Sequence, residues 1–134
     1  MSTDYAVVTE KFAERHFIKY FEKKYKGAWD ITWTSIEEEF KRFDSLLETS
    51  IAETIISGQT AGKQIKICKT EFRVAGTKES RHGSGNRCIV AVHVDALTVH
   101  VLLVYCKTDL ASSNETAQWK LIIRDNYPEY RPLL

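Results

Sequence analysis

The sequence lacks most of the features that mark metal-binding, secreted or membrane proteins. It has three cysteines, Cys68, Cys88 and Cys106, and no C-x-x-C pair, so we expect reduced thiols and no metal site. Its first residues, MSTDYAVVTEKF, lack a basic stretch followed by an apolar run, which predicts that no signal peptide is present. No apolar run approaches the roughly 18–20 residues that span a bilayer. These absences predict a cytoplasmic protein with no membrane association, no metal and no cofactor.

The length and composition are those of one folded domain. The chain holds 134 residues, of which 43% are hydrophobic, and it contains no internal repeat or low-complexity tract. We therefore treat residues 1–134 as a single domain. The net charge is only +1, but residues 61–107 hold eight Lys and Arg against three Asp and Glu. That segment is the one expected to attract a polyanion.

Two amphipathic helices are predicted in the N-terminal half. The first covers residues 10–25, where apolar side chains recur at helical spacing, and Gly27 is expected to end it. The second begins at a capping box formed by Thr34 and Glu37 and continues to Leu47.

The second half of the chain predicts a sheet. After a turn-rich break at residues 57–62, the hydrophobic pattern changes from helical to alternating. Strands are expected over residues 5–8, 63–70, 71–75, 88–94 and 98–106. A short C-terminal helix capped by Ser113 or Asn114 follows them. The predicted fold class is α+β, with two N-terminal helices packed on one face of a small antiparallel sheet whose other face is free.

Three stretches of this sequence resemble the RelE/ParE superfamily of type II toxin–antitoxin toxins, nearest its HigB-like branch. EFRVAGTKESRHGSGNRCIVAV resembles the family's segment of a strand, a loop rich in Lys, Ser and Gly, and an Arg that enters an aliphatic strand. VHVLLVYCKTD resembles the family's final strand, and ETAQWKLIIRDNY lies where many members carry a C-terminal helix. The resemblance therefore implies a RelE-like arrangement of the predicted helices and sheet.

The resemblance also implies a function. Typical members cleave messenger RNA, usually on the ribosome, and are held inactive by an antitoxin protein. ParE-type members inhibit gyrase instead, so a non-catalytic protein that binds gyrase or another partner is the alternative. The near-neutral charge of this chain differs from the basic charge of most members and favours that alternative.

Metal-independent RNA cleavage suggests which side chains to examine. It needs a group that takes the proton of the ribose 2′-hydroxyl, cations that stabilise the charged phosphorane, and a donor for the leaving oxygen. By resemblance, Arg87 and Lys107 match basic residues of the family's strands, and Tyr105 shares a strand face with Lys107. These three are the candidate catalytic residues. The candidate RNA-binding residues are Arg73, Lys78, Arg81 and His82.

The register of the 88–94 and 98–106 hairpin decides whether the three catalytic candidates meet. A two-residue turn puts Arg87 opposite Val104 and leaves Tyr105 on the other face. A three-residue turn puts Arg87 opposite Tyr105, with Lys107 on the same face. A nuclease needs the second register, because a slip of one residue moves every side chain to the other face.

Each candidate also has a purely structural interpretation. Arg81 and Arg87 can be solvated charges at the edge of a loop, and Tyr105 can be a core aromatic. Trp29 and Trp33 are expected to be exposed enough to anchor a partner, either an antitoxin helix or a second copy of the chain.

Overall fold

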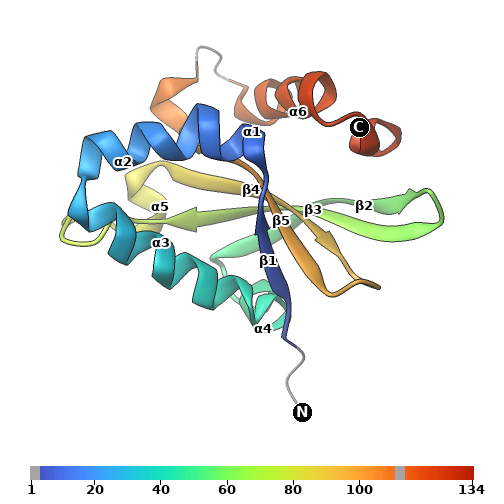
Figure 1. Cartoon of the computed structure of the whole chain (residues 1–134), viewed down its shortest axis with the longest axis horizontal. Coiled ribbons are helices and arrows are strands. Elements are labelled where there is room, and N and C mark those ends of the chain that lie inside the picture. The colour runs from blue at the N-terminus through green and yellow to red at the C-terminus, as the bar shows by residue number, and fades with distance from the viewer. Residues whose placement is uncertain (1–3, 111–113) are drawn as a thin grey trace.

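A computed structural model of the chain describes residues 4–110 and 114–134 and has a five-stranded mixed sheet with helices on both sides (Figure 1). The strands are β1 (Ala6–Thr9), β2 (Ala52–Thr60), β3 (Lys63–Phe72), β4 (Asn86–His93) and β5 (Thr98–Cys106). The helices are α1 (Lys11–Ala13), α2 (Lys19–Tyr25), α3 (Gly27–Phe40), α4 (Phe43–Leu47), α5 (Arg81–Ser84) and α6 (Glu115–Asn126). A π-helical segment, Glu14–Ile18, joins α1 to α2, and 3₁₀ turns cover Lys107–Asp109 and Pro128–Leu133.

The sheet has the strand order β1-β5-β4-β3-β2. The neighbours from β2 to β5 are antiparallel, whereas β1 runs parallel to β5 at one edge. The α+β class is therefore confirmed, and the expectation of a wholly antiparallel sheet is wrong. Parallel neighbours need a long connection, and all the helices and strands between β1 and β5 supply it here.

The N-terminal helices begin and end at other residues than expected. The first helical segment ends at Lys26, which has φ 43° and ψ −120°, and Gly27 starts α3 instead of ending the helix before it. Thr34 lies inside α3, so the predicted capping box is wrong. The earlier start follows from Trp29, which is 1% exposed and stacks on Phe21 with ring centroids 4.9 Å apart. The helical conformation of residues 27–33 places this ring in the core.

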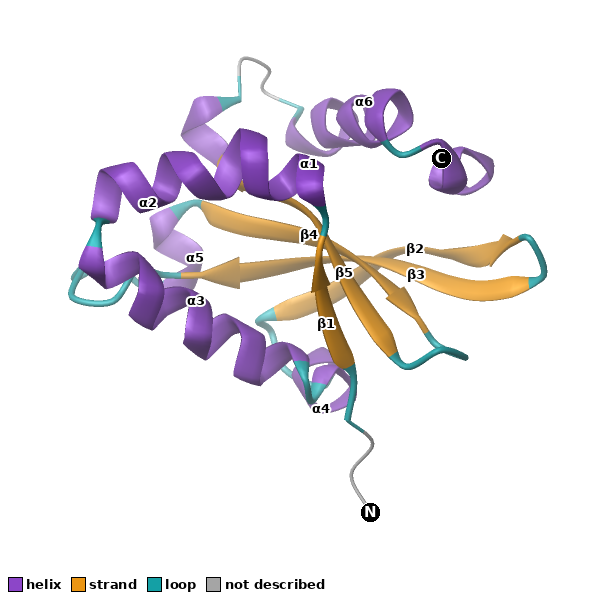
Figure 2. Ribbon diagram, in the orientation of Figure 1, coloured by secondary structure: helices purple, strands orange, loops and turns teal. Residues whose placement is uncertain are grey.

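Both faces of the sheet are covered, which corrects the expectation of a free face (Figure 2). On one side, α3 and α4 pack Ile36, Phe40 and Phe43 against valines of the sheet. On the other side, α6 and the final 3₁₀ turn bury Trp119 and Tyr130. The side chain of Asn114 caps α6 by accepting from the amide of Ala117, whereas Ser113 lies outside the described residues.

The sequence predicts a turn-rich break at residues 57–62, before the sheet, but most of this segment belongs to a strand. Residues 57–60 belong to β2, and the turn is confined to Ala61 and Gly62, which have φ 53° and 75°. β2 pairs with β3 along most of its length. Within the described residues, no helix is long and apolar enough to cross a membrane.

Candidate functional site

The segment between β3 and β4 contains a short, well-bonded helical turn. The hydroxyl of Ser80 caps α5 by accepting from the amide of Gly83 at 2.9 Å. Gly85 then ends the turn in the left-handed conformation with φ 76°. Ser84 Oγ lies 2.6 Å from the carbonyl oxygen of Phe72 and accepts from the amide of Asn86. These contacts hold α5 against the end of β3.

The hairpin places Arg87 opposite Tyr105. This is the arrangement expected from a three-residue turn, but it arises differently. His93 pairs with Thr98, which leaves four residues in the turn, and Leu102 is an extra unpaired residue that restores the register. Arg87 and Tyr105 therefore lie on the same face of the sheet.

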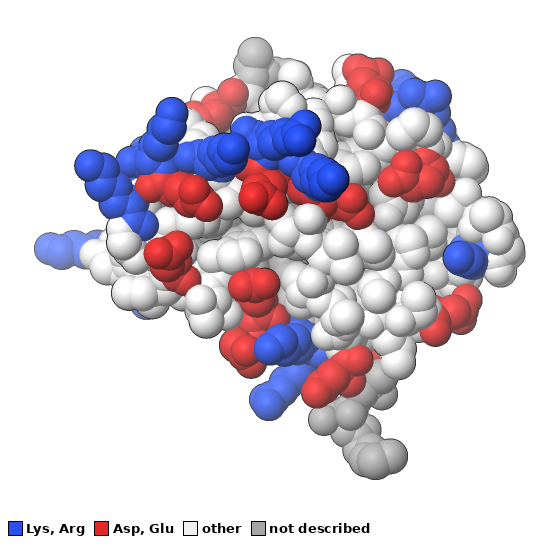
Figure 3. Space-filling view, in the orientation of Figure 1, with Lys and Arg blue, Asp and Glu red and all other residues white. Residues whose placement is uncertain are grey.

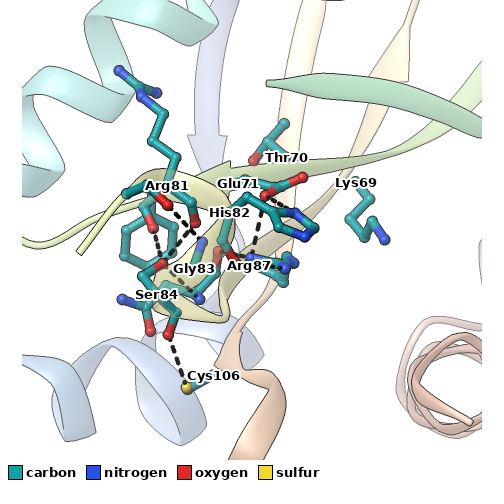
Figure 4. A network of polar contacts seen from close by, with 12 residues as sticks. Lys69, Thr70, Glu71, Arg81, His82, Gly83, Ser84, Arg87 and Cys106 are labelled. Atoms are coloured by element: carbon teal, nitrogen blue, oxygen red, sulfur yellow. Dashed lines mark hydrogen bonds and ion pairs between the residues drawn. The ribbon is translucent and has the colours of Figure 1, made fainter. Parts of the chain in front are cut away.

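Arg87 is the central residue of a polar row that crosses three strands, from Glu71 through Arg87 to Tyr105. Figure 4 shows Glu71 and Arg87 of this row together with His82. The Arg87 side chain is 3% exposed, with Nη1 3.6 Å from Glu71 Oε2. Nη1 also donates to the Asn86 carbonyl at 3.0 Å, and Nη2 donates to the His82 carbonyl at 3.3 Å. Nε has no hydrogen-bond partner among the described residues. Arg87 is therefore a buried connector and not the solvated loop-edge charge considered above.

His82 is the accessible member of this group. Its Nδ1 lies 2.9 Å from Glu71 Oε2, and its side chain is 81% exposed whereas that of Glu71 is 17% exposed. The carboxylate thus orients the exposed ring through Nδ1, and Arg87 contacts the same carboxylate oxygen (Figure 4). A cavity of about 380 Å³ opens here, between this pair and Ile51. An imidazole oriented in this way can accept or donate a proton at Nε2.

Tyr105 is buried, and its hydroxyl donates to Glu115 Oε2 at 2.5 Å. Burial, followed by the contact with Glu115, raises the pKa of Tyr105 far above its usual value. The phenol is thus a hydrogen-bond donor to α6 and is unsuited to act as a base near neutral pH. This is the structural interpretation of Tyr105 that the sequence left open.

Lys107 does not join the row. The β5 strand ends at Cys106, and Lys107 starts a 3₁₀ turn with an exposed side chain. The strand alternation that would put Lys107 on the face of Tyr105 therefore stops one residue too early. Its amide donates to the Gly85 carbonyl at 2.8 Å, and its stem lies against Gly85.

The remaining basic candidates lie elsewhere. Arg81 turns toward α3, where Nη1 lies 3.0 and 3.1 Å from the two carboxylate oxygens of Glu39. Arg73 and Arg81 both line a small cavity of about 200 Å³ beside α3. Lys78 is exposed in the connection that precedes α5.

The predicted set is therefore divided. Arg73 and Arg81 line the cavity beside α3, and Arg81 also lines the cavity at His82. Arg87 contacts the His82 carbonyl and pairs with Tyr105 across the strands.

Sequence reasoning missed Glu71, which binds both His82 and Arg87. Lys69 was also missed; it lies two residues before Glu71 on the same face of β3, with Nζ 3.8 Å from Glu53 Oε1. The available signal was charge complementarity between Glu71 and Arg87, but only the β3–β4 register shows that they pair. In the part of the chain that the structure describes, no group of three or more His, Cys, Asp or Glu side chains could hold a metal ion.

Comparison of the chain with protein-family models, with curated proteins and with solved structures gives no match in any of the three.

Proposed function

We propose that the chain is a metal-independent endoribonuclease that cleaves messenger RNA in the cytoplasm, as the toxin of a type II toxin–antitoxin pair. The observation that supports catalysis best is the exposed His82 imidazole, held by Glu71 with the buried Arg87 behind it. The resemblance of residues 71–123 to RelE/ParE toxins supports the biological role. An antitoxin protein and the ribosome are the partners that this role requires.

In the proposed reaction, His82 Nε2 takes the proton of a ribose 2′-hydroxyl. The 2′-oxygen attacks the adjacent phosphorus, and the bond to the 5′-oxygen of the next nucleotide breaks. The products are a 2′,3′-cyclic phosphate and a 5′-hydroxyl, which receives a proton from water or from the imidazolium. Arg81, which lines the cavity at His82, and Lys69, on the same face of β3 as Glu71, are the candidate cations for the phosphorane charge. Glu71 and Arg87 are positioning residues in this scheme.

A partner-binding protein without catalysis is the second candidate. The observation that favours it is the burial of Arg87 and Tyr105, two of the three residues predicted to be catalytic. A nuclease that uses those groups would have to expose them. The expectation that Trp29 and Trp33 are exposed and anchor a partner is not met, because Trp29 is buried in the core of the chain and Trp33 packs against that core.

Cleavage by the purified chain distinguishes the two functions. RNA is incubated with the chain alone and in a translating extract, and growth is followed after induction in bacteria. General acid–base catalysis is worth about 10²–10⁴-fold, so His82→Ala should lower the cleavage rate at least about 100-fold and relieve growth arrest. Arg124→Gln, on the exposed side of α6, is the control and should retain both activities.

Circular dichroism shows whether each variant is folded. A folded His82→Ala chain that cleaves as fast as the wild type would exclude the assigned role of His82. Growth arrest without RNA cleavage, unchanged in His82→Ala, would instead support the protein-binding function.

A further inference from the structure

A line of four basic residues runs along the first helical segment. Lys11, Arg15, Lys19 and Lys23 follow one another at intervals of four residues. In a regular α-helix each such step turns by about 40° more than a full circle, so a line of four would curve around the helix. The π-helical segment Glu14–Ile18 lies inside this stretch, and the amide of Lys19 donates to the Glu14 carbonyl. Because a π-helix has more residues per turn, this segment reduces the rotation between successive cations and keeps the four side chains near one line.

All four side chains are exposed, and none of them makes an ion pair among the described residues. Figure 3 shows the resulting row of blue atoms over α1 and α2, bordered by a row of red atoms on one side. Four residues of a regular α-helix rise about 6 Å along the axis, so the cations follow one another at short intervals. We name Lys11, Arg15, Lys19 and Lys23 the basic row.

The two flanks of the basic row differ. On one side of the basic row lie Glu14 and Glu22, which line a cavity beside Trp33. On the other side lie His16 and Tyr20, which line a cleft of about 310 Å³. A polyanion on the row is therefore repelled from one flank and meets rings on the other.

The cleft is mainly apolar and aromatic. Phe17 and Leu110 line it together with His16 and Tyr20, and the end of β5 closes it. Asp109 is the acidic residue of its lining. Tyr20 is 48% exposed, which is unusual for a large apolar ring in this chain. Lys24 Nζ lies 5.7 Å from the centre of the Tyr20 ring, so a cation also accompanies the aromatic side.

We propose that this surface binds a single-stranded nucleic acid, with phosphates on the basic row and a base stacked on Tyr20 in the adjacent cleft. The surface is distinct from the His82 group and needs no catalysis; only the identification of the strand as RNA rests on the proposed function. Cationic grooves with neighbouring aromatic rings bind single strands in this way. An anionic lipid surface fits less well, because the apolar side of the helix is buried through Ile18 and Phe21 and cannot enter a bilayer.

The test is binding of a short fluorescent 2′-O-methyl oligonucleotide, which cannot be cleaved through a 2′-hydroxyl, measured by anisotropy across a salt series. Arg15→Gln/Lys19→Gln removes two charges from the basic row. Lys63→Gln/Arg124→Gln removes two exposed charges elsewhere and is the matched control. Single-strand binding loses about 0.7 in the slope of log affinity against log salt for each phosphate contact. The row variant should therefore reduce the slope by about 1.4 and the affinity at least tenfold, and the control should change neither.

Stacking is tested with Tyr20. Tyr20→Ala should weaken binding by about fivefold or more, and Tyr20→Phe should bind like the wild type. Equal losses in the row variant and its control, or wild-type binding by Tyr20→Ala, would overturn the proposal. The proposal would also be overturned if the row variant lost binding to vesicles containing phosphatidylserine but bound the oligonucleotide like the wild type.

Cleavage of an unmodified RNA by the wild-type chain, measured beside oligonucleotide binding, separates this proposal from the proposed function, because His82 lies outside the basic row and the cleft. Binding on the basic row without any RNA cleavage would leave this surface established and remove the nuclease function.

Discussion

Replacing Arg87 with Ala should destabilise the fold, because the guanidinium is buried and bonded on two sides. The substitution removes two hydrogen bonds to backbone carbonyls and leaves Glu71 without its nearest cation. Breaking a buried ion pair by removing one partner costs about 3–5 kcal/mol. Glu71 is 17% exposed and keeps His82 at 2.9 Å, so the cost belongs near the lower end. We expect a loss of about 3 kcal/mol in the free energy of unfolding.

Urea unfolding followed by far-UV circular dichroism measures this loss. A double-mutant cycle then identifies its cause. If the unpaired carboxylate is responsible, Glu71→Gln should recover part of the stability lost in Arg87→Met, with a coupling energy of about 0.5–3 kcal/mol. A loss below about 1 kcal/mol in Arg87→Ala, or additive effects in the cycle, would refute the proposed contribution of this pair.

The same argument affects the choice of activity mutants. An inactive Arg87→Ala chain would not show that Arg87 touches RNA, because lost stability alone lowers the amount of folded protein. His82 is the better probe, since its side chain is 81% exposed and, among residues 4–110 and 114–134, its ring hydrogen-bonds only to Glu71.

Two further predictions concern buried groups. Burial and the neighbouring His100 lower the pKa of His93, so the folded state favours the neutral ring. The contribution of the neutral ring to stability should be fully present above the ordinary pKa of 6.5 and decrease as the pH falls below it. Thermal unfolding of His93→Gln should therefore depend less on pH than that of the wild type. An equal pH dependence would exclude this residue as the cause. Burial raises the pKa of Cys68 to about 11 and of Cys88 to about 12, so a thiol reagent near neutral pH should label Cys106 alone in the folded chain and all three cysteines in denaturant, which mass spectrometry of the labelled peptides would check.

Most helices and strands could be predicted from hydrophobic periodicity, but β2 and the strand pairing could not. The change from helical to alternating pattern was placed after residues 57–62, whereas the antiparallel part of the sheet already begins with β2 at Ala52. The four residues of β1 carry no sign of their partner, which lies more than 90 residues later in the chain. Parallel pairing at this edge follows from tertiary packing, and short-range patterns do not contain it.

The prediction of a free sheet face was wrong because the C-terminal segment has a weak pattern. Trp119 and Ile123 are four residues apart and pack on the sheet, but the exposed Leu121 between them obscures the apolar side. Tyr130 lies beyond Pro128, where regular structure was expected to end, and a 3₁₀ turn still carries this ring into the core. A proline at the start of a turn is compatible with helical geometry.

The candidate site was predicted only in part for two physical reasons. Arg87 was expected to contact a ligand because it matches a basic strand residue of the resembled family and lies in the basic segment 61–107, whereas its burial depends on Glu71 in the neighbouring strand. The basic row was missed because the charge was summed over residues 1–60, where Glu and Asp outnumber Lys and Arg. Position around a helix separates those charges on the surface, and a sum over the sequence removes that information.

The polar row depends on one residue that carries no polar group. With four residues in the turn between His93 and Thr98, an uninterrupted hairpin would pair Arg87 with Val104 and put Tyr105 on the opposite face. The unpaired Leu102 shifts the register by one residue and brings Arg87 and Tyr105 to the same face. Leu102 is fully buried in the core that also contains Trp119. Because α6 both packs in this core and accepts the Tyr105 hydroxyl through Glu115, the C-terminal helix stabilises the register on which the polar row depends.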